Sequence, residues 1–280
     1  MPFAYLADRR FLRVAGPDAP DFLQNLITTD LVSLPAGEAR PGALLTPQGK
    51  ILFDFMIWRD GDTFAMETDI GQQDGLVRRL TMYKLRASVE IGLIDDVGLT
   101  AIWGKGTDAE GPADARFAKA GIALVRLVGP ANVDMEVGDY DRLRIEAGVP
   151  LSGVDFALQD AFPHDTLMDL NGGLSFRKGC YVGQEVVSRM QHRGTARRRL
   201  VKITSETELP QTGTEISAGG RPVGILGTVS GQDGLAIVRT DRVGAAQAAG
   251  VPLLAGEVAV AARLPEWTGL SFPIDEGAEP

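Results

Sequence analysis

The chain has 280 residues, of which 44% are hydrophobic and 23% are charged, as is typical of globular proteins. Its net charge of -9 argues against a role in coating nucleic acid, because proteins with that role carry an excess of Lys and Arg. Its one cysteine excludes an intramolecular disulfide and fits a reducing compartment. Met1 to Val14 lacks the apolar core of a signal peptide, and no run approaches the ~18 apolar residues of a membrane span. We therefore predict a cytosolic protein without membrane association.

The first half of the chain alternates helices with strands and hairpins, which favours an α+β fold. Asp54 lies in an apolar strand, where a carboxylate is costly unless it is paired, so it is either a hydrogen-bonded structural residue or part of a cavity wall. Apolar periodicity and turn residues predict, in chain order, a strand over 11–14, a helix over 17–27, strands over 43–45, 51–58 and 63–68, a helix over 73–86, strands over 88–94, 100–103 and 122–128, and a helix over 139–147.

The segment 177–185 reads R-K-G-C-Y-V-G-Q-E and contains Cys180. Arg177 and Lys178 precede the thiol, and a helix is predicted from Gly183 to a stop signal at Gly194. Nearby cations and a helix N-terminus both favour the thiolate over the thiol. We therefore interpret Cys180 as a functional thiol; the alternative is a small buried hydrophobic residue.

After Gly194 the sequence changes to short β-rich runs separated by Gly-rich or polar turns, as in a small antiparallel barrel. We predict an N-terminal α+β region over 1–193, built of two intertwined subdomains, and a C-terminal β-barrel domain over 194–280. The last residues, 275–280, form a predicted frayed acidic tail.

A basic cluster begins at the end of the predicted helix. Because Arg offers a planar fork to oxyanions, the cluster could meet carboxylates, phosphates or an RNA backbone. Alternatively, it is a solvated face with acidic partners in the same chain. Its members are Arg189, Arg193, Arg197, Arg198, Arg199 and Lys202.

Metal and nucleotide chemistry find little support in the sequence. His164 and His192 lack partners at ligand spacing, and one cysteine cannot supply the four thiolates of a stable iron–sulfur cluster. No phosphate-binding glycine motif occurs. We predict no resident metal site; a pairing of Cys180 with either histidine as base stays open, because only the fold decides it.

The octapeptide from Lys178 to Glu185 resembles the K-G-C-[FY]-x-G-Q-E signature of the YgfZ family, the folate-binding relatives of the glycine-cleavage T-protein. Downstream, Arg189 and Arg193 with Gly194 match the same pattern, and the segment 144–150, R-I-E-A-G-V-P, resembles one common to the wider superfamily. The resemblance covers nearly the whole chain. It implies a T-protein-like ring of subdomains around a central cavity, followed by the antiparallel barrel.

The resemblance also implies a function. It implies a cavity that accepts tetrahydrofolate or a derivative, and a role in assembly or repair of iron–sulfur clusters that affects cluster enzymes such as those that modify tRNA. Expected partners are cluster assembly or client proteins. Cys180 and Lys178 are the expected functional residues. Those expected to bind the folate are Asp54, Tyr181, Gln184, Glu185, Arg189 and Arg193.

Two departures from the T-protein pattern separate the alternatives. Aminomethyltransferases carry two consecutive acids where this chain has Phe53 and Asp54, and the Y-T-G-E-x-G-like folate segment is absent between 122 and 146. Both favour an accessory protein over an enzyme. The alternatives are a folate-dependent aminomethyltransferase or other one-carbon transferase, and an RNA-contacting accessory protein built around the basic cluster.

Overall fold

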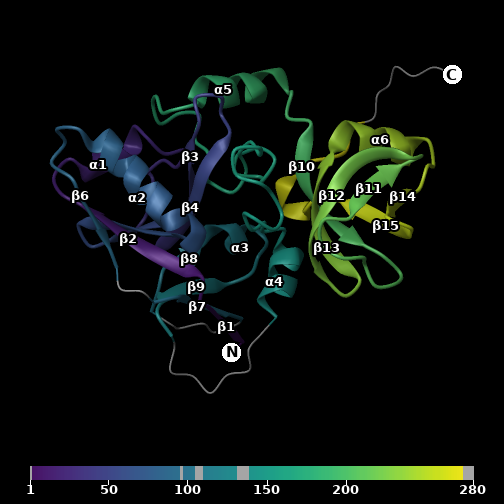
Figure 1. The fold of residues 1–280 in the computed structure, drawn as a ribbon, viewed down its shortest axis with the longest axis horizontal. Coiled ribbons are helices and arrows are strands. Elements are labelled where there is room, and N and C mark those ends of the chain that lie inside the picture. The colour runs from purple at the N-terminus through teal and green to yellow at the C-terminus, as the bar shows by residue number, and fades with distance from the viewer. Residues whose placement is uncertain (1, 95–96, 105–109, 131–138, 274–280) are drawn as a thin grey trace. The chain divides into compact units, whose positions relative to one another are not determined.

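The computed structural model describes residues 2–94, 97–104, 110–130 and 139–273 (Figure 1). Contacts divide the chain into two compact units. The first comprises Met1–Asp139 and Met168–Val186, and the second comprises Tyr140–Leu167 and Val187–Pro280. Helix α4 (Tyr140–Ala147) and most of helix α5 (Gln184–Arg193) thus belong to the second unit, whose barrel strands all follow Gly194. The predicted acidic tail, 275–280, lies outside the described residues.

The described part of the first unit contains a nine-stranded sheet in the order β1-β7-β9-β8-β3-β4-β5-β2-β6. Strands β3 and β8 pair in parallel, whereas neighbours such as β3 and β4 pair antiparallel. The bounds are β1 (Phe3–Leu6), β2 (Arg9–Ala15), β3 (Glu38–Leu45), β4 (Ile51–Asp60), β5 (Thr63–Asp69), β6 (Glu90–Leu93), β7 (Leu99–Trp103), β8 (Ala113–Asp114) and β9 (Leu124–Val128).

Local chemistry sets where the helices of this unit begin. They are α1 (Ala19–Gln24), α2 (Ile70–Lys84) and α3 (Ala115–Lys119). Helix α2 begins earlier than predicted because the carboxylate of Asp69 accepts a hydrogen bond of 2.8 Å from the backbone N–H of Gly71, satisfying one of the free donors at the helix start. It packs on β2 and β5.

The apolar core of the first unit lies on one face of the sheet, beneath α1 and α2. Leu12 of β2, Leu44 of β3 and Met66 of β5 have no exposed surface and meet Leu23 of α1 and Leu76 of α2. Burying a large aliphatic side chain contributes about 1.5–3 kcal/mol. The sheet face that α1 and α2 cover is therefore the apolar one.

The opposite face of β5 presents a buried ionic network instead. Glu67 has no solvent exposure, and Nε and Nη2 of Arg126 each donate to its carboxylate at 2.6 Å. Arg9 donates to the same carboxylate at 2.6 Å, while Nη1 of Arg126 donates to Asp114 at 2.6 Å. The network thus joins β2, β5, β8 and β9, which lie apart in the sequence.

The second unit contains a closed barrel in the order β10-β13-β12-β11-β14-β15, in which β15 also pairs with β10. All its pairings are antiparallel, which confirms the predicted antiparallel barrel. Its bounds are β10 (Arg198–Thr204), β11 (Glu215–Ala218), β12 (Arg221–Ser230), β13 (Asp233–Arg239), α6 (Thr240–Ala248), β14 (Leu253–Ala255), β15 (Val258–Arg263) and the 3-10 helix η1 (Glu266–Thr268).

Several short elements were not predicted, notably α3, α6 and strands β1, β8 and β14. Helix α3 spans only Ala115–Lys119, too short for an apolar period to show. It forms where the sequence predicts a polar connection, because Asp114 accepts a hydrogen bond of 2.9 Å from the backbone of Arg116 at its start. Short elements of this kind are fixed by caps and neighbours.

The ionic network makes folding stability depend on pH. Burial alone would raise the pKa of Glu67, but the charges of Arg126 and Arg9 outweigh it and lower that pKa from 4.5 to about 2. A carboxyl group with a lowered pKa contributes stability at pH values above 4.5, and that stability is lost as the pH falls towards 2.

We expect Glu67→Gln to lower the free energy of unfolding at pH 7 by about 3–5 kcal/mol, because it leaves a buried guanidinium incompletely paired. The loss should narrow as the pH falls from 4.5 to 2, where the wild-type carboxylate is itself protonated. Urea unfolding across this pH range measures both.

The matched control is Glu38→Gln, which removes a partly exposed pair with Arg40 and should cost less than about 1 kcal/mol. Equal losses in the two variants, or a loss in Glu67→Gln that does not change with pH, would contradict this account of the network.

Candidate functional site

Cys180 lies on the surface of the first unit. Its side chain is free and exposed, in the loop that runs into α5 (Gln184–Arg193). The helix begins and ends where the sequence predicts. Exposure excludes the alternative of a small buried hydrophobic residue, and it leaves the sulfur accessible to another molecule.

Lys178, two residues before the cysteine, anchors this loop. Its ammonium group donates hydrogen bonds of 2.7 Å to the backbone carbonyl groups of Ile27 and of Thr29. The same ammonium lies 5.4 Å from the centroid of the Tyr181 ring, a distance at which a cation is attracted to the face of the ring. Lys178 therefore acts through the segment between α1 and β3, not through a free charge at the surface.

Burial lowers the pKa of Lys178 from 10.5 to about 7, although the nearby carboxylate of Asp30 favours the charged form. Between pH 7 and pH 10.5, this lysine therefore binds fewer protons in the folded chain than in the unfolded chain. Stability therefore rises with pH from 7 to 10.5 through this group.

The segment that receives Lys178 is itself fixed by Thr28, which is fully buried. The backbone N–H of Thr28 donates to the carbonyl of Ala43, and its side-chain oxygen accepts from the N–H of Ala43 at 2.9 Å. The hydroxyl of Thr28 donates to the carbonyl of Gly173 at 2.6 Å, and its carbonyl accepts from Ser175. Strand β3 and the start of the cysteine loop are thus joined through one residue.

Tyr181 and Gly183 fix the loop on the other side of the thiol. The Tyr181 hydroxyl donates to the carbonyl of Ser175 at 2.9 Å, and burial raises the pKa of this phenol. Gly183 has φ +80°, and a β-carbon there would lie 2.5 Å from the carbonyl oxygen of Thr46. Only glycine fits both the backbone angle and the space. Cys180 therefore sits at the exposed centre of a loop held at both ends.

Asp54, Gln184 and Glu185 occupy three different settings. Asp54 is half-buried on β4, between β3 and β5, and its carboxylate accepts a hydrogen bond of 2.8 Å from the amide of Gln72. Gln184 donates from its backbone to the carbonyl of Tyr181 at 3.2 Å. Glu185 is exposed in the first turn of α5, where a negative charge suits the helix dipole.

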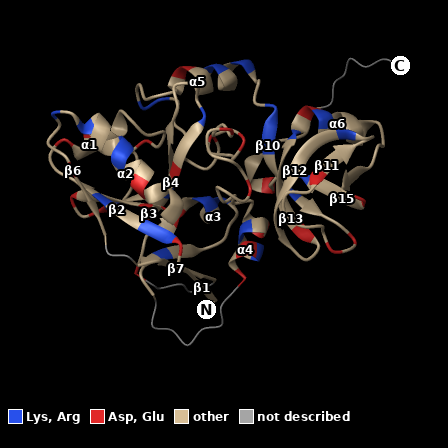
Figure 2. Ribbon diagram, in the orientation of Figure 1, with Lys and Arg blue, Asp and Glu red and all other residues tan. Residues whose placement is uncertain are grey.

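The predicted basic cluster lies in the second unit, at the end of α5 and along β10 (Figure 2). Arg198 pairs with Asp160 at 2.9 Å, and Arg199 is buried and donates to the carbonyl of His164 at 2.8 Å. By contrast, Arg189 and Arg193 are exposed. Part of the cluster thus has the intramolecular partners that the alternative interpretation expected.

Lys178, Cys180 and Tyr181 lie in one loop, and Gln184 is the first residue of the helix that follows it. Sequence reasoning missed the segment that holds them, from Ile27 to Asp30. No side-chain signal could have found it, because the atoms that bind Lys178 are backbone carbonyl oxygens, which every sequence possesses.

Within residues 2–94, 97–104, 110–130 and 139–273, no group of three His, Cys, Asp or Glu side chains could hold a metal ion. No helix in that part of the chain is long and apolar enough to cross a membrane. Cavities of about 580, 430 and 660 Å³ lie on the two units. None of the predicted site residues lines these three cavities.

Comparisons with known proteins decide the family. A family model of the CAF17 C-terminal beta-barrel domain matches residues 197–270. The mitochondrial iron-sulfur cluster assembly factor IBA57 of Homo sapiens is 30% identical, over 94% of this chain and 84% of the human protein. This chain belongs to the IBA57 family. The YgfZ resemblance thus correctly indicated a family of iron–sulfur cluster assembly factors.

Other comparisons support the same family and fold, and they correct the predicted cellular location. The IBA57 homolog of Pyricularia oryzae is 31% identical over 71% of this chain, which spans 56% of that protein. Aminomethyltransferase T of the glycine cleavage system from Bartonella henselae, at 18% identity, has the same fold, with a TM-score of 0.74 over 92% of this chain and 84% of that one. The predicted cytosolic location is wrong, because these IBA57 relatives are mitochondrial proteins.

We expect Lys178→Met to loosen the cysteine loop, because the carbonyl groups of Ile27 and Thr29 lose their donor. The free energy of unfolding should fall by about 1–3 kcal/mol, and amide hydrogen exchange should accelerate in 27–30 and 177–183. Arg177→Met, at an exposed neighbouring position, is the control and should change neither. Equal exchange in the two variants would mean that Lys178 does not anchor the loop.

Proposed function

We propose that this protein is an iron–sulfur cluster assembly factor in which Cys180 supplies a thiolate to iron or to a cluster shared with a partner protein. The observation that carries the proposal is an exposed thiol at the centre of a loop fixed on both sides. Membership of the IBA57 family supports the same role. Lys178 acts by holding the loop and Cys180 by meeting the cluster.

The number of available ligands supports a shared cluster. An iron–sulfur cluster takes four cysteine or equivalent ligands, and this chain has one cysteine. The cluster is therefore cargo, and the remaining ligands come from the donor or the recipient. A surface thiol suits this exchange, because both the partner and the cluster must reach the sulfur.

We also propose tetrahydrofolate or a derivative as the small-molecule ligand, and tRNA-modifying enzymes among the clients, as the YgfZ resemblance implies. The support is the fold shared with an aminomethyltransferase. Two of the three ammonium N–H groups of Lys178 and the hydroxyl hydrogen of Tyr181 already bind backbone carbonyl groups. We assign a contact with the ligand to the half-buried Asp54, on β4 of the first unit.

We expect Cys180→Ala to abolish cluster delivery without unfolding the protein, since exposed substitutions change stability by about 0.5 kcal/mol or less. Cells that depend on this protein should lose activity of a cluster-containing enzyme and retain that of a cluster-free enzyme. Arg86→Ala, at an exposed arginine outside the cysteine loop, is the control and should support full activity. Normal cluster-enzyme activity with Cys180→Ala, at equal protein abundance, would remove the thiol from the mechanism.

Calorimetric titration of tetrahydrofolate into the wild-type protein should show saturable binding. Asp54→Asn should weaken it about 10- to 100-fold, as expected for loss of a hydrogen bond to a charged group. Arg86→Ala, at an exposed arginine, should leave the affinity unchanged. Absence of binding heat from the wild-type protein would exclude folate as the ligand and leave the proposal for Cys180 intact.

A further inference from the structure

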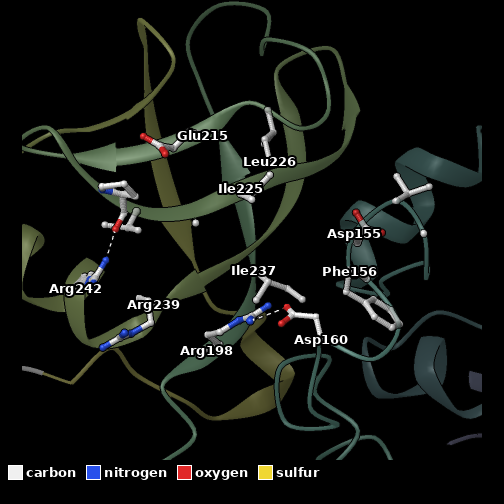
Figure 3. Close-up of a pocket in the computed structure, with 16 residues that line it drawn as sticks. Asp155, Phe156, Asp160, Arg198, Glu215, Ile225, Leu226, Ile237, Arg239 and Arg242 are labelled. Carbon is white, nitrogen blue, oxygen red and sulfur yellow. Dashed lines mark hydrogen bonds and ion pairs between the residues drawn. The ribbon is translucent and has the colours of Figure 1, made fainter. Parts of the chain in front are cut away.

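The second unit carries a cleft of about 580 Å³ that neither the thiol nor the folate proposal uses (Figure 3). This volume lies within the range of about 300–1,000 Å³ typical of ligand pockets. The cleft lies between the loop of residues 153–160 and the faces of β12 and β13. The apolar residues that line it include Phe156, Ile225 and Ile237, while the side chains of Val223 and Leu226 pack into the barrel core.

A buried arginine holds the loop wall of the cleft in place. Nη1 of Arg144, in α4, donates to the carboxylate of Asp155 at 2.9 Å, and its Nη2 donates to the hydroxyl of Thr228 at 2.8 Å. The other carboxylate oxygen of Asp155 accepts from the backbone N–H of Thr228 at 2.7 Å. Arg144 begins the R-I-E-A-G-V-P segment that the proposed function leaves unexplained. Its role here is to join this wall to the barrel.

A β-bulge makes this junction available. The register between β12 and β13 shifts between Leu226 and Val229, so Thr228 is released from the ladder and its N–H can meet Asp155. Gly227 is required beside it, because a β-carbon there would collide with the carboxylate of Asp155. The hydrogen bond between Thr228 and Asp155 therefore fixes the distance between the 153–160 loop and strand β12.

The floor of the cleft exposes one aliphatic side chain. Ile225 pairs with Ile237 across the β12–β13 ladder and is 60% exposed. Next to Ile225, the backbone of Gly224 lies so near β13 that a β-carbon there would be 2.6 Å from the carbonyl oxygen of Ile237. Ile225 therefore stands exposed on a rigid backbone beside the less exposed Ile237, within a cleft large enough for a ligand.

The charges around the cleft favour an anion at one end. Arg198 pairs with Asp160, and Arg239 pairs with Asp241 at 2.6 Å. Arg242 donates to the backbone carbonyl of Pro222, and no carboxylate pairs with it among the residues that the structure describes. Glu215, on β11, is the carboxylate that also lines this cleft from the barrel, so an anionic group is accepted beside Arg242 and repelled beside Glu215.

We propose that this cleft binds a short segment of a partner protein in which a carboxylate side chain stands next to aliphatic ones. The aliphatic groups cover Ile225 and Ile237, and the carboxylate pairs with Arg242. A peptide fits better than a compact polyanion, because the other two arginines are already neutralised by Asp160 and Asp241. Arginines at the edge of an apolar pocket are frequent anchors of such contacts.

The test uses the full chain with ¹³C-labelled Ile and Leu methyl groups and three short peptides. The peptides share a Gly/Ser flank and differ at the centre: Leu-Asp-Leu, Leu-Lys-Leu and Ser-Asp-Ser. Only Leu-Asp-Leu should shift the methyl resonances of Ile225 and Ile237 and bind with a measurable Kd. Arg242→Glu should weaken that binding about tenfold or more, Arg242→Lys should retain most of it, and Glu215→Gln should strengthen it.

Ile225→Ala should also weaken binding while leaving the thermal unfolding midpoint unchanged, because the side chain is largely exposed. Equal shifts with Leu-Lys-Leu, with Ser-Asp-Ser or with inorganic phosphate would overturn the proposal, as would no shift with any peptide. Methyl shifts on dilution without peptide would assign the cleft to a second copy. Shifts on removal of residues 274–280 would assign it to the chain's own acidic end.

Discussion

The first unit depends on one carboxylate that has no access to water. Glu67 remains charged because Arg126 and Arg9 bind it, and Arg126 extends the contact to Asp114 on β8. Strand β8 pairs in parallel with the start of β3. The network therefore connects β2 and β5, on one side of β3 in the sheet, with β8 and β9 on its other side. A buried ion pair of this kind adds little net stability but penalises every other arrangement of its partners.

Strand β3 of that sheet holds the loop that carries the exposed thiol. Strand β3 holds Thr28, and the segment around Thr28 supplies the two carbonyl groups that bind Lys178. Cys180 follows within the same loop, and Gly183 packs against the turn at Thr46. A thiol that accepts cargo from one protein and passes it to another benefits from this combination, because the sulfur is open to solvent while the backbone beneath it does not have to be reordered.

The second unit uses a buried arginine in a comparable way. Arg144 satisfies its guanidinium with Asp155, Thr228 and the carbonyl of Val149, and thereby fixes a loop against a barrel. In both units, buried charge positions an exposed surface: a thiol in the first, an apolar cleft in the second. The two proposed contacts, one for a shared cluster and one for a peptide segment, therefore lie on separate units of one chain.

The sequence by itself determined the α+β class, the antiparallel barrel, the helix after the cysteine and the kinship with iron–sulfur cluster assembly factors, since these depend on local period, turn residues and an octapeptide. Only the tertiary structure decided that Cys180 is exposed, that Lys178 binds the carbonyl groups of Ile27 and Thr29, and that Arg144 supports a cleft. These contacts join residues distant in the chain. Their acceptors are often backbone atoms, which are the same at every position, so no pattern of side chains could reveal them.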